Sequence, residues 1–167
     1  MTSVLPKIRL GAAIILLCAI YLPLSQCSRN GENLKPPTTQ ALAHSRHLFP
    51  RSDSDYEYQY AIKDVIAVGT NPKDNGLRGV MTLVAFLWPL GFAIWSSKSE
   101  FPRFWWIFFA GELLLCAGTA YWIYALAYGT SGRWLYGGYV AEGAIAVYAI
   151  TTLAAIGKRL RKSSRSN

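Results

Sequence analysis

The sequence contains few of the residues, and none of the motifs, that usually mark a catalytic site. It has two histidines and three cysteines, and the cysteines form no C-x-x-C pair, so thiol–disulfide chemistry is unsupported. The patterns G-x-x-x-x-G-K-S/T, G-x-S-x-G and H-E-x-x-H do not occur. We therefore expect a protein that is not an enzyme and carries no cofactor.

Charged residues are also scarce. They make up 16% of the chain, against about 25% in soluble domains, while 52% of the residues are hydrophobic. The charges are mostly basic and give a net charge of +8. Because the basic residues flank long apolar runs, where they set membrane orientation, they do not indicate a nucleic-acid partner. The composition predicts a protein whose surroundings are the lipid bilayer.

The run from 104 to 128 is the clearest membrane span. Its only charged residue is Glu112, and about 20 apolar residues suffice to cross the ~30 Å hydrocarbon core of a bilayer. Aromatic side chains collect at both membrane–water interfaces. Both ends of this run are aromatic, with Trp105 and Trp106 at one and Tyr121, Trp122, Tyr124 and Tyr128 at the other.

Three further apolar runs predict an all-α integral membrane protein, a four-helix transmembrane bundle. Pro89 lies near the middle of the second run, where a proline predicts a kink. The last run is rich in alanine. The predicted division is a cytoplasmic stub and first helix over 1–24, a polar extracytoplasmic loop over 25–78, helices over 79–97, 104–128 and 137–157, and a basic cytoplasmic tail over 158–167.

The first apolar run has the layout of a signal sequence or a signal anchor, because Lys7 and Arg9 stand at its start. Near its end, Leu24 stands three residues before Cys27, which partly resembles the lipobox of lipoproteins, although Gln26 replaces the usual small residue. Lipidation of Cys27 would give a three-span form. No clean A-x-A cleavage site follows, so we expect an uncleaved anchor.

The polar segment 25–78 contains a predicted strand or hairpin. Tyr56, Tyr58 and Tyr60 alternate with polar residues, which is the period of a half-buried strand with an aromatic face. Residues 65–68 would extend this strand. Since a single strand is not stable alone, its tyrosine face must lie on the membrane surface, the bundle or a partner protein.

The basic residues of the short loops and tails divide unequally between the two sides of a four-span topology. Nine lie on the side of the termini, and Arg133 alone lies in the short loop opposite. The positive-inside rule then puts both termini in the cytoplasm and the segment 25–78 outside. The compact design favours a bacterial inner (plasma) membrane.

Two acidic residues, Glu112 and Glu142, fall inside predicted spans. An ionisable side chain in the bilayer costs about 2.5–3.5 kcal/mol on insertion scales, so each is a candidate functional residue. Glu112 shares a helix face with Cys116 and Thr119, and both acids are expected to point into the bundle.

The two carboxyl groups are not expected to meet, because helix rise places them on the order of 10 Å apart in depth. No Lys, Arg or His is assigned to the membrane interior, so desolvation would favour the protonated form of each. Three interpretations stay open. They are a hydrogen bond from a neutral carboxyl to a neighbouring helix, the handling of protons or cations, and pairing with a partner subunit.

Small residues predict where helices pack closely. Gly111 and Gly118 lie seven residues apart on the third span. Gly137 and Ala141 are four apart on the last span, a spacing that lets helices approach one another.

The two histidines, His44 and His47, lie in the outer segment, so the bundle has no histidine pair for haem. Their spacing would let them share a metal on a helix, but no third ligand is in register. A solvated loop is the simpler interpretation, and no metal is predicted.

Two functional hypotheses follow. The first is a non-catalytic accessory or scaffold subunit, whose outer segment and small-residue faces contact a larger membrane partner. The second is a small proton- or cation-coupled transporter or channel, which would act as an oligomer through Glu112 and Glu142.

Overall fold

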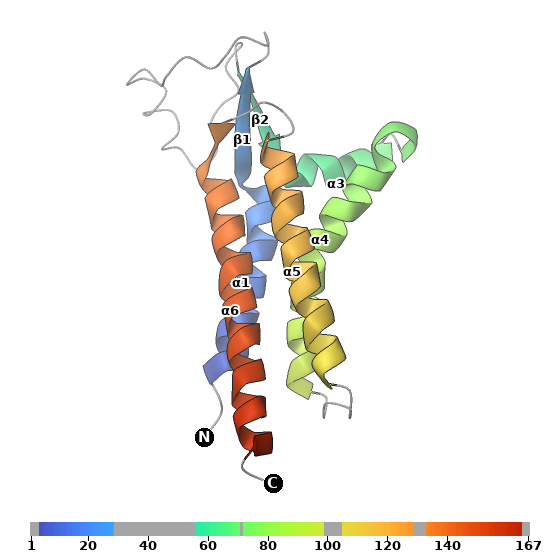
Figure 1. Ribbon diagram of the computed structural model, residues 1–167. Coiled ribbons are helices and arrows are strands. Elements are labelled where there is room, and N and C mark those ends of the chain that lie inside the picture. Colours follow the sequence, from blue (N-terminus) through green and yellow to red (C-terminus); the bar gives the residue numbers. More distant parts are fainter. Residues whose placement is uncertain (1–3, 29–55, 71, 99–104, 129–132, 165–167) are drawn as a thin grey trace, which may run out of the picture.

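Four long helices form the body of the molecule and run side by side (Figure 1). The computed structural model describes residues 4–28, 56–70, 72–98, 105–128 and 133–164. All four helices are long and apolar enough to cross a membrane. The chain is therefore a multi-pass membrane protein, as its composition predicts.

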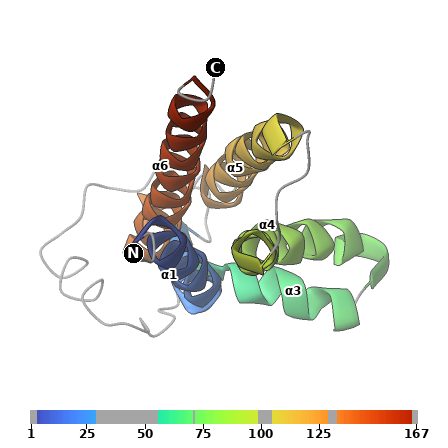
Figure 2. The same cartoon turned by 90° about the horizontal axis from the view of Figure 1, so that it is seen from below.

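The four spans alternate in direction. They are α1 (Val4–Cys18), which continues into the 3-10 turn η1 (Ala19–Tyr21), then α4 (Pro72–Lys98), α5 (Trp105–Tyr128) and α6 (Tyr136–Ser164). Figure 2 shows them at the corners of a square in the order α1, α4, α5, α6. Both termini therefore lie at the same end of the bundle (Figure 1).

Two of these helices extend past the apolar runs that predicted them. α4 begins at Pro72 rather than at residue 79, and proline is favoured at a first helical position because its missing N–H needs no partner there. α6 continues to Ser164, through the basic residues predicted as a tail. Hydrophobicity marks only the part of a helix that lies in lipid, whereas Lys and Arg are good helix formers outside it.

A three-stranded antiparallel sheet covers the end of the bundle opposite the termini (Figure 1). Its central strand is β1 (Pro23–Ser28), with β2 (Tyr56–Tyr60) and β3 (Arg133–Trp134) on either side. β1 pairs with β2 along its length and with β3 at Ser25 and Gln26. The sequence hides β1, because this strand crosses the predicted boundary between the first apolar run and the polar segment 25–78.

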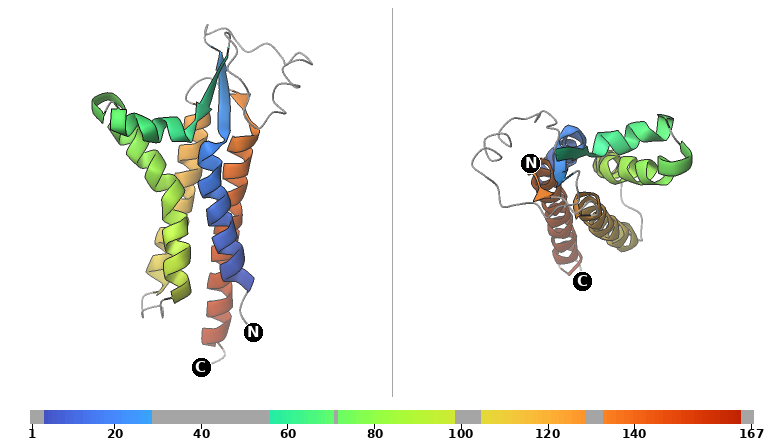
Figure 3. Two further views of the ribbon diagram at one scale, coloured as in Figure 1. Left: turned by 180° about the vertical axis from the view of Figure 1, so that it is seen from behind. Right: turned by 90° about the horizontal axis from the view of Figure 1, so that it is seen from above.

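α3 (Ala61–Thr70) lies across the end of α4 nearer the sheet (Figure 3). The prediction that residues 65–68 extend the strand is therefore wrong. Ile62 and Val65 lie three residues apart, on one helix face, and both pack against the core. A Cβ at Gly79 of α4 would overlap the backbone of α3, so the absence of a side chain there lets the two helices touch.

α1 and α6 pack along one another through small side chains. Ala12 and Ala13 of α1 and Ala141 of α6 are all buried in the core. At the end of α6 nearer the sheet, a Cβ on Gly137 would lie 2.5 Å from the carbonyl oxygen of Pro23, which leaves no room for a side chain. Gly137 and Ala141 thus lie where α6 meets α1 and β1.

Gly111 and Gly118 lie on the outward face of α5. Both are exposed, and a Cβ at either position would meet nothing within 4 Å. Neither glycine therefore packs against another described helix, and the expectation that they allow close helix approach stays a prediction. α5 meets its neighbours through the opposite face, which carries Glu112, Cys116 and Thr119.

Pro89 lies inside α4 and its side chain is fully buried. α4 runs obliquely under α3 and then turns along the other spans (Figure 3). A kink caused by Pro89 stays a prediction.

Candidate functional site, a buried charged cluster

Arg9 occupies the buried face of α1. Ala12, Ala13 and Leu16 follow it at three, four and seven residues, and all three are buried. Because one helix face holds all four side chains, the Arg9 guanidinium points at the neighbouring helices instead of outward.

Arg9 forms an ion pair with Glu112 of α5. Tyr148 of α6 donates its hydroxyl hydrogen to Glu112 Oε1 over 2.7 Å, and Arg9 Cζ lies 4.9 Å from the centre of the Tyr148 ring. Arg9 is 7% exposed, Glu112 3% and Tyr148 1%. These three residues are named the Glu112 cluster below.

The prediction that no cation neutralises Glu112 is wrong. By sequence, Arg9 belongs to the basic flank of the first span, but α1 already begins at Val4 and carries Arg9 inside the apolar window. A buried arginine is tolerable there because a carboxylate and an aromatic ring compensate its charge. Glu112 therefore does not need to be a neutral acid to lie inside the bundle.

The cluster is costly to form and more costly to break. Removing a charge from water costs several kcal/mol, and its attraction to the partner offsets this only when further hydrogen bonds are made. Tyr148 supplies one such bond, and the buried Arg9 Nε has no hydrogen-bond partner among the described residues. Loss of one charged partner would leave the other uncompensated, at about 3–5 kcal/mol.

α4 completes the surroundings of the cluster through Trp88. Its ring meets the Tyr148 ring edge-on, with centroids 5.6 Å apart, and its indole N–H donates to Thr119 Oγ1 over 2.7 Å. Thr119 and Cys116 lie seven and four residues beyond Glu112 and are buried on the same face of α5. All four spans thus contribute a side chain to the cluster or to its surroundings.

A second tryptophan–threonine bond joins α4 to α5 nearer the sheet. The Trp122 indole N–H donates to Thr82 Oγ1 over 3.1 Å, and the Thr82 hydroxyl donates to the carbonyl oxygen of Arg78 over 2.8 Å. Each of these two helices therefore sends one tryptophan to a threonine of the other. These bonds satisfy indole N–H groups that the bilayer would leave without partners.

At the end of the bundle nearer the sheet, Asp64 links α3 to α4 and β2. Arg78 Nε of α4 lies 3.3 Å from Asp64 Oδ2, and the Gln59 side-chain amide of β2 donates to the same carboxylate over 3.4 Å. Burial raises the pKa of Asp64 above its ordinary value of 3.8, and the nearby Arg78 guanidinium offsets only part of this rise. Burial also raises the pKa of Tyr60, at the end of β2.

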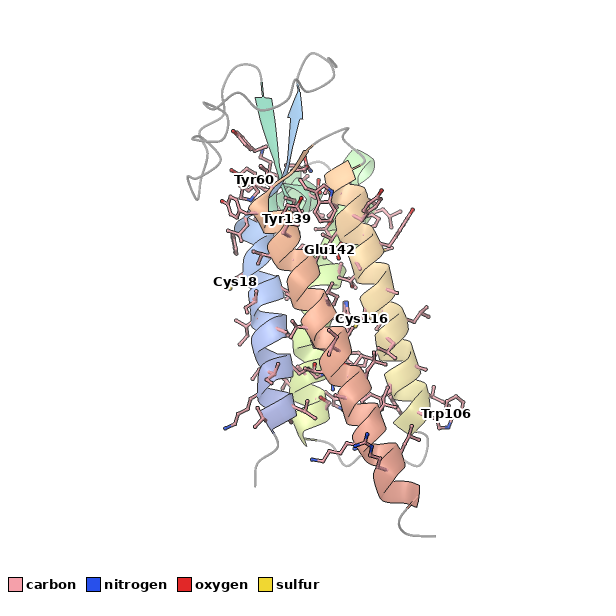
Figure 4. All side chains as sticks on the ribbon, turned by 60° about the vertical axis from the view of Figure 1, so that its left-hand side comes forward. Cys18, Tyr60, Trp106, Cys116, Tyr139 and Glu142 are labelled. Carbon is pink, nitrogen blue, oxygen red and sulfur yellow. The ribbon has the colours of Figure 1, made fainter. Side chains whose placement is uncertain are left out.

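Glu142 is separate from the cluster. It lies closer to the sheet than Cys116 does (Figure 4), is half-buried, and forms no hydrogen bond or ion pair with any described residue. Tyr148 marks the level of Glu112 on α6, and it is six residues from Glu142, which is roughly 9 Å along a helix. The two carboxyl groups therefore do not share a proton.

The remaining candidates lie away from the cluster. Cys27 is in β1, where its backbone pairs with that of Glu57, whereas His44 and His47 lie outside the described residues. In the part of the chain that the structure describes, no three His, Cys, Asp or Glu side chains group together as metal ligands do.

Sequence reasoning missed Arg9 and Tyr148 as site residues. The signal for Arg9 was its spacing from Ala12, Ala13 and Leu16, which marks the packed face of a helix. Tyr148 had a weaker signal, a hydroxyl deep in an alanine-rich span rather than at an interface.

Comparison with known proteins identifies no relative. No protein-family model matches the chain, and neither a curated protein nor a solved structure matches it.

Proposed function

We propose that the protein is a non-catalytic accessory or scaffold subunit of a bacterial inner membrane, with both termini in the cytoplasm, that associates with a larger membrane protein. The observation that carries this proposal is the mutual neutralisation of Arg9 and Glu112. A transport path needs an ionisable group that exchanges its partner for a passing ion. Here each charge is committed to the other, and Tyr148 holds the carboxylate in place.

Two surfaces are suited to a partner. The outward face of α5 carries Gly111 and Gly118, whose missing side chains let a helix of another protein approach closely. At the outer end, the sheet and α3 form a platform that is continuous with the spans, since β1 follows α1 and β3 precedes α6. A rigid bundle beneath this platform would fix its position relative to a partner.

Co-purification of the full-length chain from membranes in mild detergent tests this function. We expect wild-type protein to bring down a membrane protein in stoichiometric amount. Gly118→Leu should retain the fold, because nothing lies within 4 Å of that position, and should lose the partner. Gly143→Leu, at an equally open position on α6, is the matched control. Wild-type protein that always purifies as a lone monomer would contradict the proposal.

A second candidate function, proton- or cation-coupled transport by an oligomer, is favoured by Glu142. Its half-buried carboxyl group makes no bond to a described residue, which leaves it available to an ion. Flux into proteoliposomes under a proton or sodium gradient tests this function. Transport by wild type that Glu142→Gln abolishes would favour the transporter over the scaffold.

A further inference from the structure

Both termini lie at one end of the bundle (Figure 1), and α1 and α6 carry basic residues toward that end. Lys7 of α1 and Lys158 and Arg161 of α6 are exposed there, and Arg159 of α6 is partly exposed. In that half of the bundle, the only acidic side chain among the described residues is Glu112, whose charge Arg9 already neutralises. The described surface at this end is therefore uniformly positive.

α6 holds three of these cations on a regular helix. The helix does not stop where its apolar run ends but continues to Ser164. Lys158 and Arg161 are three residues apart and so lie on the same side of the helix. A helix that leaves the hydrocarbon in this way carries its cations to the level of the lipid headgroups.

Arg159 is directed toward α5. Its Cζ lies 5.7 Å from the centre of the Phe109 ring, and Phe109 is buried. A ring at this distance attracts the guanidinium and favours one orientation of the side chain. A guanidinium held in this way can bind phosphate oxygens in a bidentate manner, whereas a lysine offers a point charge.

We propose that this basic surface, formed by Lys7, Lys158, Arg159 and Arg161, binds the phosphate headgroups of anionic phospholipids. A lipid suits it better than a soluble phosphate, because large apolar side chains are also exposed on the helices toward this end of the bundle. Leu153, five residues before Lys158 on α6, is exposed, as is Trp106 on α5. A bound lipid would then place its acyl chains along the span and its phosphate beside Lys158 and Arg161, which lie on the same side of α6.

Native mass spectrometry of the full-length protein in detergent, with added phosphatidylglycerol or phosphatidylcholine, tests the proposal. We expect wild type to retain phosphatidylglycerol in preference to phosphatidylcholine. Because each cation near an anionic surface contributes about fivefold in affinity, Lys158→Gln with Arg161→Gln should reduce retention of phosphatidylglycerol by roughly 25-fold. Phosphatidylcholine retention should not change.

Two control variants separate lipid binding from general effects of charge. The exchange of Lys158→Arg with Arg161→Lys keeps the charge and should keep the preference, and Lys63→Gln removes a cation from α3 at the opposite end. Equal retention of the two lipids by wild type, or an equal loss in Lys63→Gln, would overturn the proposal. Displacement of the lipid by an equal concentration of glycerol phosphate would also overturn it, because the headgroup alone would then be recognised.

Discussion

Arg9 and Glu112 form an ion pair between α1 and α5, which stand at diagonally opposite corners of the bundle (Figure 2). The pair therefore crosses the middle of the bundle instead of joining two neighbouring helices. Tyr148 reaches the same carboxylate from α6, and Trp88 of α4 contacts the Tyr148 ring. Because all four spans meet at this level, the cluster fixes their relative positions.

Glu112→Gln should destabilise the protein by about 3–5 kcal/mol, because it leaves the Arg9 charge buried without a counter-ion. Thermal unfolding of the purified variants in detergent, monitored by size-exclusion chromatography, measures this loss of stability. Replacing both charges, with Arg9→Met and Glu112→Met together, should recover most of the stability. A single Glu112→Gln variant as stable as wild type would contradict the assigned role of the pair.

Tyr148→Phe should cost about 0.6–2 kcal/mol, since it removes one hydrogen bond to Glu112 and retains the ring beside Arg9. The same assay measures this loss. In the Arg9→Met, Glu112→Met background the Tyr148→Phe substitution should have a different effect, because no carboxylate remains to accept the bond. Equal losses in the two backgrounds would show that the hydroxyl does not act through Glu112.

Asp64 should make the attachment of α3 depend on pH. Its folded pKa lies above the unfolded value of 3.8, so its contribution to stability is fully present below that value and declines as pH rises through the folded pKa. Hydrogen exchange of α3 amides, corrected for the intrinsic pH dependence of exchange, should show greater protection at lower pH. Asp64→Asn should remove this dependence, and a dependence that persists in the variant would contradict the assignment.

Gly137→Ala should be strongly destabilising, by about 1–3 kcal/mol or more, because its Cβ would overlap the backbone of β1. Gly111→Ala is the matched control in another span, where nothing lies within 4 Å. It should be neutral or slightly stabilising, since alanine favours a helix. The melting temperatures of the two variants measure this difference. Equal melting temperatures would contradict the close contact between Gly137 and β1.

Mature protein should retain α1 as an uncleaved anchor. Cleavage before Cys27 would remove Arg9, leave the buried Glu112 without its counter-ion, and cost about 3–5 kcal/mol. The intact mass of the purified protein decides between the forms. A mass that begins at an acylated Cys27 would contradict this expectation.

The spans were predictable from sequence, and the contacts between them were not. Length and hydrophobicity identify all four helices, because the bilayer demands both. Hydropathy also marks Glu112 as unusual, but it assigns Arg9 to a flank, since a charge near the end of an apolar run normally faces water. The contacts of Arg9 with Glu112 and Tyr148 show that Arg9 is turned inward.

The sheet was hidden for a different reason. β1 begins with the last two residues of the first apolar run and ends in the polar segment, so it shows no alternating pattern, and the strand at Tyr56–Tyr60 had no visible partner. Residues 65–68 fit either period over so short a stretch, and their contact with Gly79 of α4 decides for a helix. In both cases a contact between distant parts of the chain determines the local structure.

The long separation between Arg9 and Glu112 in the chain has a consequence for biogenesis. Glu112 leaves the ribosome about a hundred residues after Arg9, which at 5–20 residues per second is a delay on the order of 5–20 s. Tyr148 follows later still. During this interval the first helix carries an uncompensated arginine, and its long side chain can reach the headgroups of the nearer leaflet. Completion of α5, the third span, then offers Arg9 a counter-ion, so the ion pair between α1 and α5 can form only after α5 is synthesised.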